Sequence, residues 1–220
     1  MTYKTLTSWK DISIRQYIAL YNLDKTLPEP LKDNPTEDDI TDYELQMYDF
    51  MLKKIGILYG LNESKVENIP MSHFQTMKSE MEFTSTEPET CDIKNEIIID
   101  GTTYKLKEDL GNIKLGEWVD FEAFNKDSIS NLNRILALLY KKEGLDKYIP
   151  SEVDEAAEAF LDNVDIQTCL AAFFLFYLFA LNFIPSDIQD TSMFQKAEME
   201  IQKLKIEMNQ NNQLKELLVA

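Results

Sequence analysis

The sequence predicts a mainly α-helical protein, a helical domain with one β-hairpin and a long C-terminal helix. Apolar residues recur at intervals of three and four over most of the 220 residues, as in amphipathic helices. One segment, 96–106, instead places β-branched and aromatic residues on both sides of an Asp-Gly pair. A third feature is the uncharged apolar run 169–181, which is typical of a buried helix.

These patterns divide the chain into four parts. We expect an N-terminal helix within 1–24 and a linker over 25–41, which contains three prolines and many acidic residues. A helical domain over 42–189 includes the hairpin 96–106, and a C-terminal helix covers 190–220.

The first half of the chain is expected to be helical. A helix over 7–24 can be capped by Thr7 or Ser8, and a second helix over 42–59 can end at Gly60. Shorter helices are predicted over 62–66 and 70–83, the latter starting at a proline.

The hairpin is the one strong strand signal. Asp100 and Gly101 suit the two positive-φ positions of a type I′ turn. Because an isolated hairpin is only marginally stable in water, it must pack on a helix or join another chain's sheet. Its apolar side chains are therefore candidates for partner docking: Ile97, Ile99 and Tyr104.

Helices follow the hairpin, over 115–125, 128–140, 151–161 and 166–184. The last contains the apolar run. A membrane span needs about 20 apolar residues, and the run is shorter and flanked by aspartates rather than by Lys or Arg. A buried core or interface helix is the favoured interpretation, with docking candidates at its centre: Phe176 and Leu178.

The segment 190–220 carries apolar residues at heptad-like spacing. The stripe covers about three heptads, so it is compatible with packing inside the chain as well as with self-association or partner docking. Its candidate docking residues are Phe194, Ile201, Leu204 and Met208.

The formal net charge of −17 limits the partners. It disfavours nucleic acid and anionic membrane surfaces, which both select basic proteins, and it favours basic protein partners. The two cysteines, Cys91 and Cys169, are expected to stay reduced, as in a cytosolic protein.

No catalytic motif is present in the sequence. Both nucleotide-binding glycine motifs and the G-x-S-x-G nucleophile turn are missing. His73 is expected on the surface, and the acids of 37–44 are best explained by a helix N-terminus rather than by a metal. Glu117 and Asp120 could form an acid–base pair, but a solvated helix face is favoured. We therefore expect no enzyme activity and no catalytic, cofactor or metal site.

Several segments together resemble a group of small proteins from tailed phages of Bacteroidales, including the crAss-like phages. They are residues 8–17 (SWKDISIRQY), 57–70 (ILYGLNESKVENIP), 99–104 (IDGTTY) with 115–121 (LGEWVDF), and 131–140 (NLNRILALLY). The apolar helix near the end completes the order, so that the resemblance covers most of 8–184. The linker 25–41 and the C-terminal helix depart from the pattern.

The resemblance implies a phage virion structural protein made in the host bacterial cytoplasm. It would be a subunit of a portal or tail ring or of the head–tail connection, in contact with other phage structural proteins and with copies of itself. The alternative is a tail-assembly chaperone that shields partner segments and is absent from the mature virion. A third hypothesis, an enzyme, would need a site at His73 or in 37–42.

Overall fold

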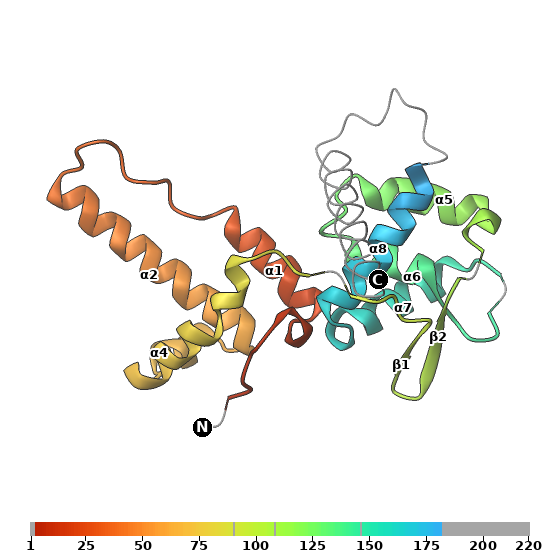
Figure 1. Ribbon diagram of the computed structural model, residues 1–220, viewed down its shortest axis with the longest axis horizontal. Coiled ribbons are helices and arrows are strands. Elements are labelled where there is room, and N and C mark those ends of the chain that lie inside the picture. Colours follow the sequence, from red (N-terminus) through yellow and green to blue (C-terminus); the bar gives the residue numbers. More distant parts are fainter. Residues whose placement is uncertain (1–2, 90, 108, 146, 182–220) are drawn as a thin grey trace, which may run out of the picture. The chain divides into compact units, whose positions relative to one another are not determined.

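The computed structural model describes residues 3–89, 91–107, 109–145 and 147–181 (Figure 1). This part contains eight α-helices and one three-stranded antiparallel sheet, so the mainly α fold with a hairpin is confirmed. Met1–Ala172 forms one compact unit, and a second begins at Phe173. The helix expected over 190–220 lies outside the described residues.

The helix predicted over 7–24 is interrupted. A short 3₁₀ turn, Trp9–Asp11, precedes α1 (Ile14–Asp24), which Ser13 and Gln16 cap reciprocally. The break occurs because residues 12–14 pair with residues 164–166 in an extended conformation. The Ile14 N–H donates to the Val164 carbonyl (3.2 Å), and the Ile166 N–H donates to the Ile12 carbonyl (2.9 Å).

Helix α2 (Glu37–Tyr59) starts five residues before the predicted position at 42, so the linker is shorter than expected. Thr36 caps it with Asp39, and three acids occupy the first turn, where the helix dipole favours negative charge. Gly60 ends it with φ +64°, as predicted. Helix α2 is followed by α3 (Glu63–Glu67), α4 (Met71–Glu80) and the 3₁₀ turn Glu82–Ser85.

The hairpin forms as predicted. Strands β1 (Glu96–Ile99) and β2 (Thr102–Leu106) are joined by Asp100 and Gly101, with φ of +49° and +79°. A third strand that the sequence did not predict, β3 (Tyr140–Lys142), pairs with β2. The sheet order is β1-β2-β3, and both neighbours of β2 are antiparallel to it.

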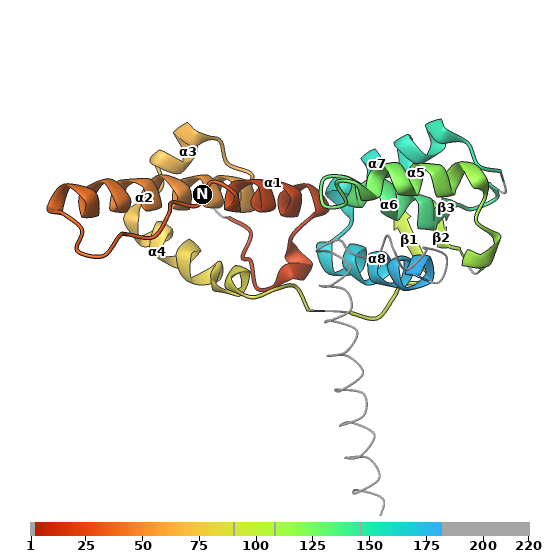
Figure 2. The ribbon, with the colours of Figure 1, turned by 90° about the horizontal axis from the view of Figure 1, so that it is seen from above.

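The hairpin is followed by the remaining helices, of which α6 and α7 contact strand β3. They are α5 (Leu115–Asn125), α6 (Leu132–Leu139), α7 (Pro150–Asn163) and α8 (Ile166–Leu181), with a 3₁₀ turn at Leu110–Asn112. Seven of the eight residues of α6 are buried, and α6 packs against α7 (Figure 2). The Tyr104 ring of β2 lies edge-on to Phe160 of α7, with ring centres 4.9 Å apart.

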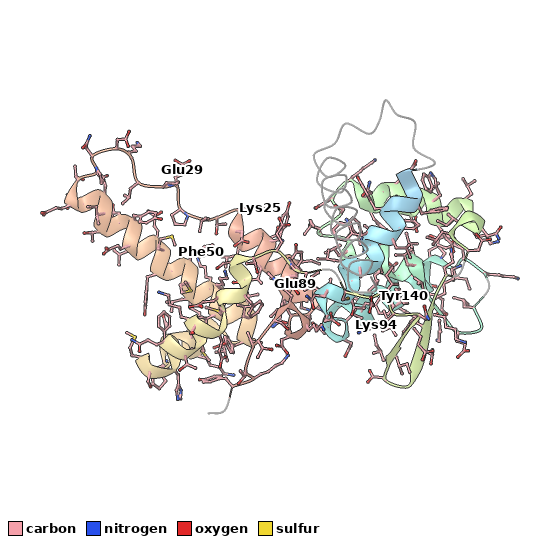
Figure 3. All side chains as sticks on the ribbon, in the orientation of Figure 1. Lys25, Glu29, Phe50, Glu89, Lys94 and Tyr140 are labelled. Carbon is pink, nitrogen blue, oxygen red and sulfur yellow. The ribbon has the colours of Figure 1, made fainter. Side chains whose placement is uncertain are left out.

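The segment before β1 is anchored by a buried tyrosine. Tyr140 is fully buried, and its hydroxyl donates to the Lys94 carbonyl at 2.5 Å (Figure 3). Burial raises the pKa of Tyr140 to about 12, so the hydroxyl keeps the proton that it donates. None of the helices among the described residues is long and apolar enough to cross a lipid bilayer.

Candidate functional site

The hairpin is the predicted docking element that the structure describes completely, and its outer strand has an open edge. The Leu106 N–H of β2 donates to the Asn95 carbonyl (2.9 Å) just before β1. The backbone N–H and C=O groups of successive residues in an antiparallel strand point alternately toward and away from the neighbouring strand. Because the Asn95 carbonyl points toward β2, the N–H and C=O groups of Glu96 and Ile98 point away from it. In the described part of the chain no other strand pairs with this edge.

The two faces of the hairpin differ sharply in exposure. The three predicted docking side chains, Ile97, Ile99 and Tyr104, are each less than a tenth exposed and pack inside this chain. Ile98, which points to the opposite face, is 63% exposed. Docking through the three buried residues therefore stays a prediction, and a partner at the folded hairpin would contact the β1 edge and Ile98.

The apolar helix α8 is described up to Leu181. In the first unit, Ile166, Cys169 and Ala172 are fully buried. In the second unit, the candidate Phe176 is 1% exposed. For Leu178 the structure describes the backbone but not the side chain, and the candidates after it lie outside the described residues. Docking through these side chains therefore stays a prediction: Leu178, Phe194, Ile201, Leu204 and Met208.

Beside the sheet lies a buried ion cluster centred on Glu117 in the first turn of α5. The carboxylate is 2% exposed and forms ion pairs with the ammonium groups of Lys107 and Lys141. It also accepts a hydrogen bond from the Lys114 N–H at 2.8 Å. The cluster links α5 to β3 and to Lys107, the residue after β2. The prediction that Glu117 lies on a solvated helix face is therefore wrong.

Protonation of the cluster follows from its surroundings. Burial by itself raises the pKa of Glu117, but the hydrogen bonds from Lys107, Lys141 and the Lys114 N–H outweigh burial and lower it. Burial also lowers the pKa of Lys107. The carboxylate is thus held ionised by three donors, an arrangement that suits a structural link better than a proton shuttle.

The loop after β3 closes over α5 through Tyr148. Its hydroxyl donates to the Asp120 carboxylate, and its ring lies on Gly116. Burial and the Asp120 carboxylate raise the pKa of Tyr148. A cavity of about 20 Å³ beside Tyr148 and Glu117 has room for about one water molecule. The second member of the suspected acid–base pair, Asp120, is therefore an acceptor for a tyrosine.

The other chemically active side chains that the structure describes lie apart from one another. His73 is exposed on α4, where its ring lies 6.1 Å from that of Tyr3. Within the described residues no group of three or more His, Cys, Asp or Glu side chains could hold a metal. Both cysteines are free, and burial raises the pKa of both Cys91 and Cys169, which disfavours the reactive thiolate.

Comparison of the chain with protein-family models, with curated proteins and with solved structures finds no match in any of the three. The function is therefore argued from the surfaces described above and from the sequence.

Proposed function

We propose that this protein is a structural subunit of a tailed-phage particle that works through protein–protein contacts. The proposed location is a portal or tail ring or the head–tail connection. The observation that supports an interaction role most is the open edge of β1. Natural proteins commonly protect such edges with charged residues or Pro, whereas β1 carries a single charged residue, Glu96, followed by three consecutive isoleucines.

The β1 edge suits a repeated contact between subunits. In a ring, neighbouring subunits meet head to tail, so one surface of each copy must fit a different surface of the next. An extended segment of a neighbour can add to β1 as a fourth strand, with backbone hydrogen bonds to Glu96 and Ile98. The exposed Ile98 side chain then gives the contact an apolar anchor.

The assignment to a phage particle depends on the sequence resemblance over most of 8–184. Under this proposal the partners are other phage structural proteins and further copies of the chain, and the protein is made in the host cytoplasm. The net charge of −17 favours one alternative, a soluble tail-assembly chaperone.

The test is mass spectrometry of purified phage particles, with the copy number measured against the major capsid protein. A fixed, small whole number of copies per particle is the expected result. Absence from particles together with abundance in infected cells would favour the chaperone. Absence from both would overturn the phage assignment.

A further inference from the structure

Within the part of the chain that the structure describes, the N-terminal half of α2 packs against almost nothing. Eleven of the thirteen residues 37–49 are exposed and the other two are half-buried. Phe50 is the first buried residue of the helix (Figure 3). This half is still a well-formed helix, because Thr36 caps it and three acids complement its dipole. In Figures 1 and 2 it projects past the start of α4.

Large apolar side chains gather where α2 meets α4. The Tyr48 ring of α2 lies 6.0 Å from the Phe74 ring of α4. Leu45 precedes Tyr48 by three residues, so the two lie on the same face of α2. Met71 likewise precedes Phe74 by three residues and lies on the same face of α4. Leu45 is 63%, Tyr48 49% and Met71 64% exposed. We call these four residues the α2–α4 patch.

The α2 side of the patch is strongly acidic. Residues 33–49 contain seven Asp and Glu and no Lys or Arg. In the described structure, Asp49 forms an ion pair with Lys53 of the same helix, and Asp39 is engaged in the cap of α2. A partner that covers the apolar side chains would also meet this negative charge, and only a basic partner would be attracted by it.

We propose that the α2–α4 patch binds an amphipathic helix of another protein, rich in Lys or Arg. Apolar side chains of the partner would lie against Leu45, Tyr48 and Met71, in the usual manner of a helix bound to a helical surface. Its basic side chains would face the acids of α2. The inference goes beyond the proposed function, because it concerns a different surface and holds for any process in which the protein acts.

The test uses the full-length protein and a synthetic helical peptide of about 18 residues, with Leu along one face and Lys elsewhere. Binding is followed by fluorescence anisotropy of the labelled peptide. The double variant Leu45→Ser/Met71→Ser should weaken binding at least about tenfold. The control, Leu115→Ser/Val119→Ser, removes two exposed apolar residues from α5 and should leave binding unchanged.

A second pair of variants tests the charge. Asp42→Asn/Glu44→Gln should weaken binding and reduce its salt dependence. The control, Glu122→Gln/Glu155→Gln, removes the same amount of charge from exposed positions of α5 and α7. Like the Leu115→Ser/Val119→Ser control, it should leave peptide binding unchanged. Thermal melts by circular dichroism check that every variant stays folded.

Three results would overturn the inference: equal binding by patch and control variants, equal binding of a peptide with Glu in place of Lys, or self-association that Leu45→Ser/Met71→Ser abolishes. The last would identify a second copy as the occupant. None of these results bears on the presence of the protein in particles, so the proposed function and this inference can fail separately.

Discussion

The ring of Tyr148 lies so close to Gly116 that a side chain at residue 116 would collide with it. A Cβ built on Gly116 would be 2.6 Å from Cε1 of Tyr148 and 2.7 Å from Cδ1. The ring cannot turn away freely, because its hydroxyl donates to Asp120 on the same helix. The loop after β3 is thus fixed on α5 by one ring.

Gly116→Ala should therefore destabilise the protein, although Ala is normally better than Gly in a helix by about 1 kcal/mol. We expect a loss of about 1–3 kcal/mol in the free energy of unfolding, as for other overpacked sites. Urea unfolding measures it. In a Tyr148→Leu background the same change should cost much less, and an equal cost in both backgrounds would show that the ring is not the obstacle.

Replacing the buried carboxylate of the ion cluster should have a larger effect. Glu117→Gln leaves the ammonium groups of Lys107 and Lys141 beside each other without a counter-charge. Breaking a buried pair in this way costs about 3–5 kcal/mol, which urea unfolding would detect. Glu122→Gln, five residues later on the exposed side of α5, should change stability by less than about 0.5 kcal/mol.

The same carboxylate predicts a pH dependence with a definite sign. The pKa of Glu117 is lowered from 4.5 in the folded state, so the unfolded chain takes up the proton first as the pH falls. The stabilisation is complete above the unfolded value and is lost as the pH falls through the folded value. The stability difference between wild type and Glu117→Gln should therefore shrink below pH 4.5. A difference that stays constant from neutral pH down to acid unfolding would contradict it.

The sequence was sufficient to predict those elements that depend only on residues close together in the chain. The Asp100–Gly101 turn and the bounds of α5 needed only turn geometry and helical spacing. Strand β3 could not be found in this way, because Tyr140 continues the apolar pattern of α6 and two lysines follow it. Pairing with β2 defines that strand, and it brings Lys141 to Glu117. The ion cluster was therefore missed, and so was the break in the first helix, which depends on residues 164–166.

Replacing one buried amide should stabilise the protein, in contrast to the changes at Gly116 and Glu117. Gln167 in the first turn of α8 is 6% exposed, and its Oε1 has no hydrogen-bond partner in the described part of the chain. An unsatisfied buried polar atom costs free energy, and Met has a similar shape without that atom. Gln167→Met should raise the unfolding free energy by about 1 kcal/mol.

The matched control for this change is Gln16→Met. The Gln16 side chain accepts from the Ser13 N–H (2.9 Å) and donates to the Leu58 carbonyl (2.8 Å). Its loss should destabilise the protein by about 1–2 kcal/mol. Thermal or urea unfolding of both variants decides the matter, and a destabilising Gln167→Met would mean that the amide has a partner.

The open edge of β1 gives the prediction that links structure to assembly. Ile98→Lys places a charge on the exposed face of the edge strand, where lysine opposes the addition of another strand. Because Ile98 is 63% exposed, the melting temperature of the isolated protein should hardly change. Incorporation into particles, measured by mass spectrometry in a complementation experiment, should fall strongly. Val119→Lys, at a β-branched residue of α5 that is 53% exposed, is the control and should assemble normally. If the two variants assemble equally well, the β1 edge is not the contact between subunits.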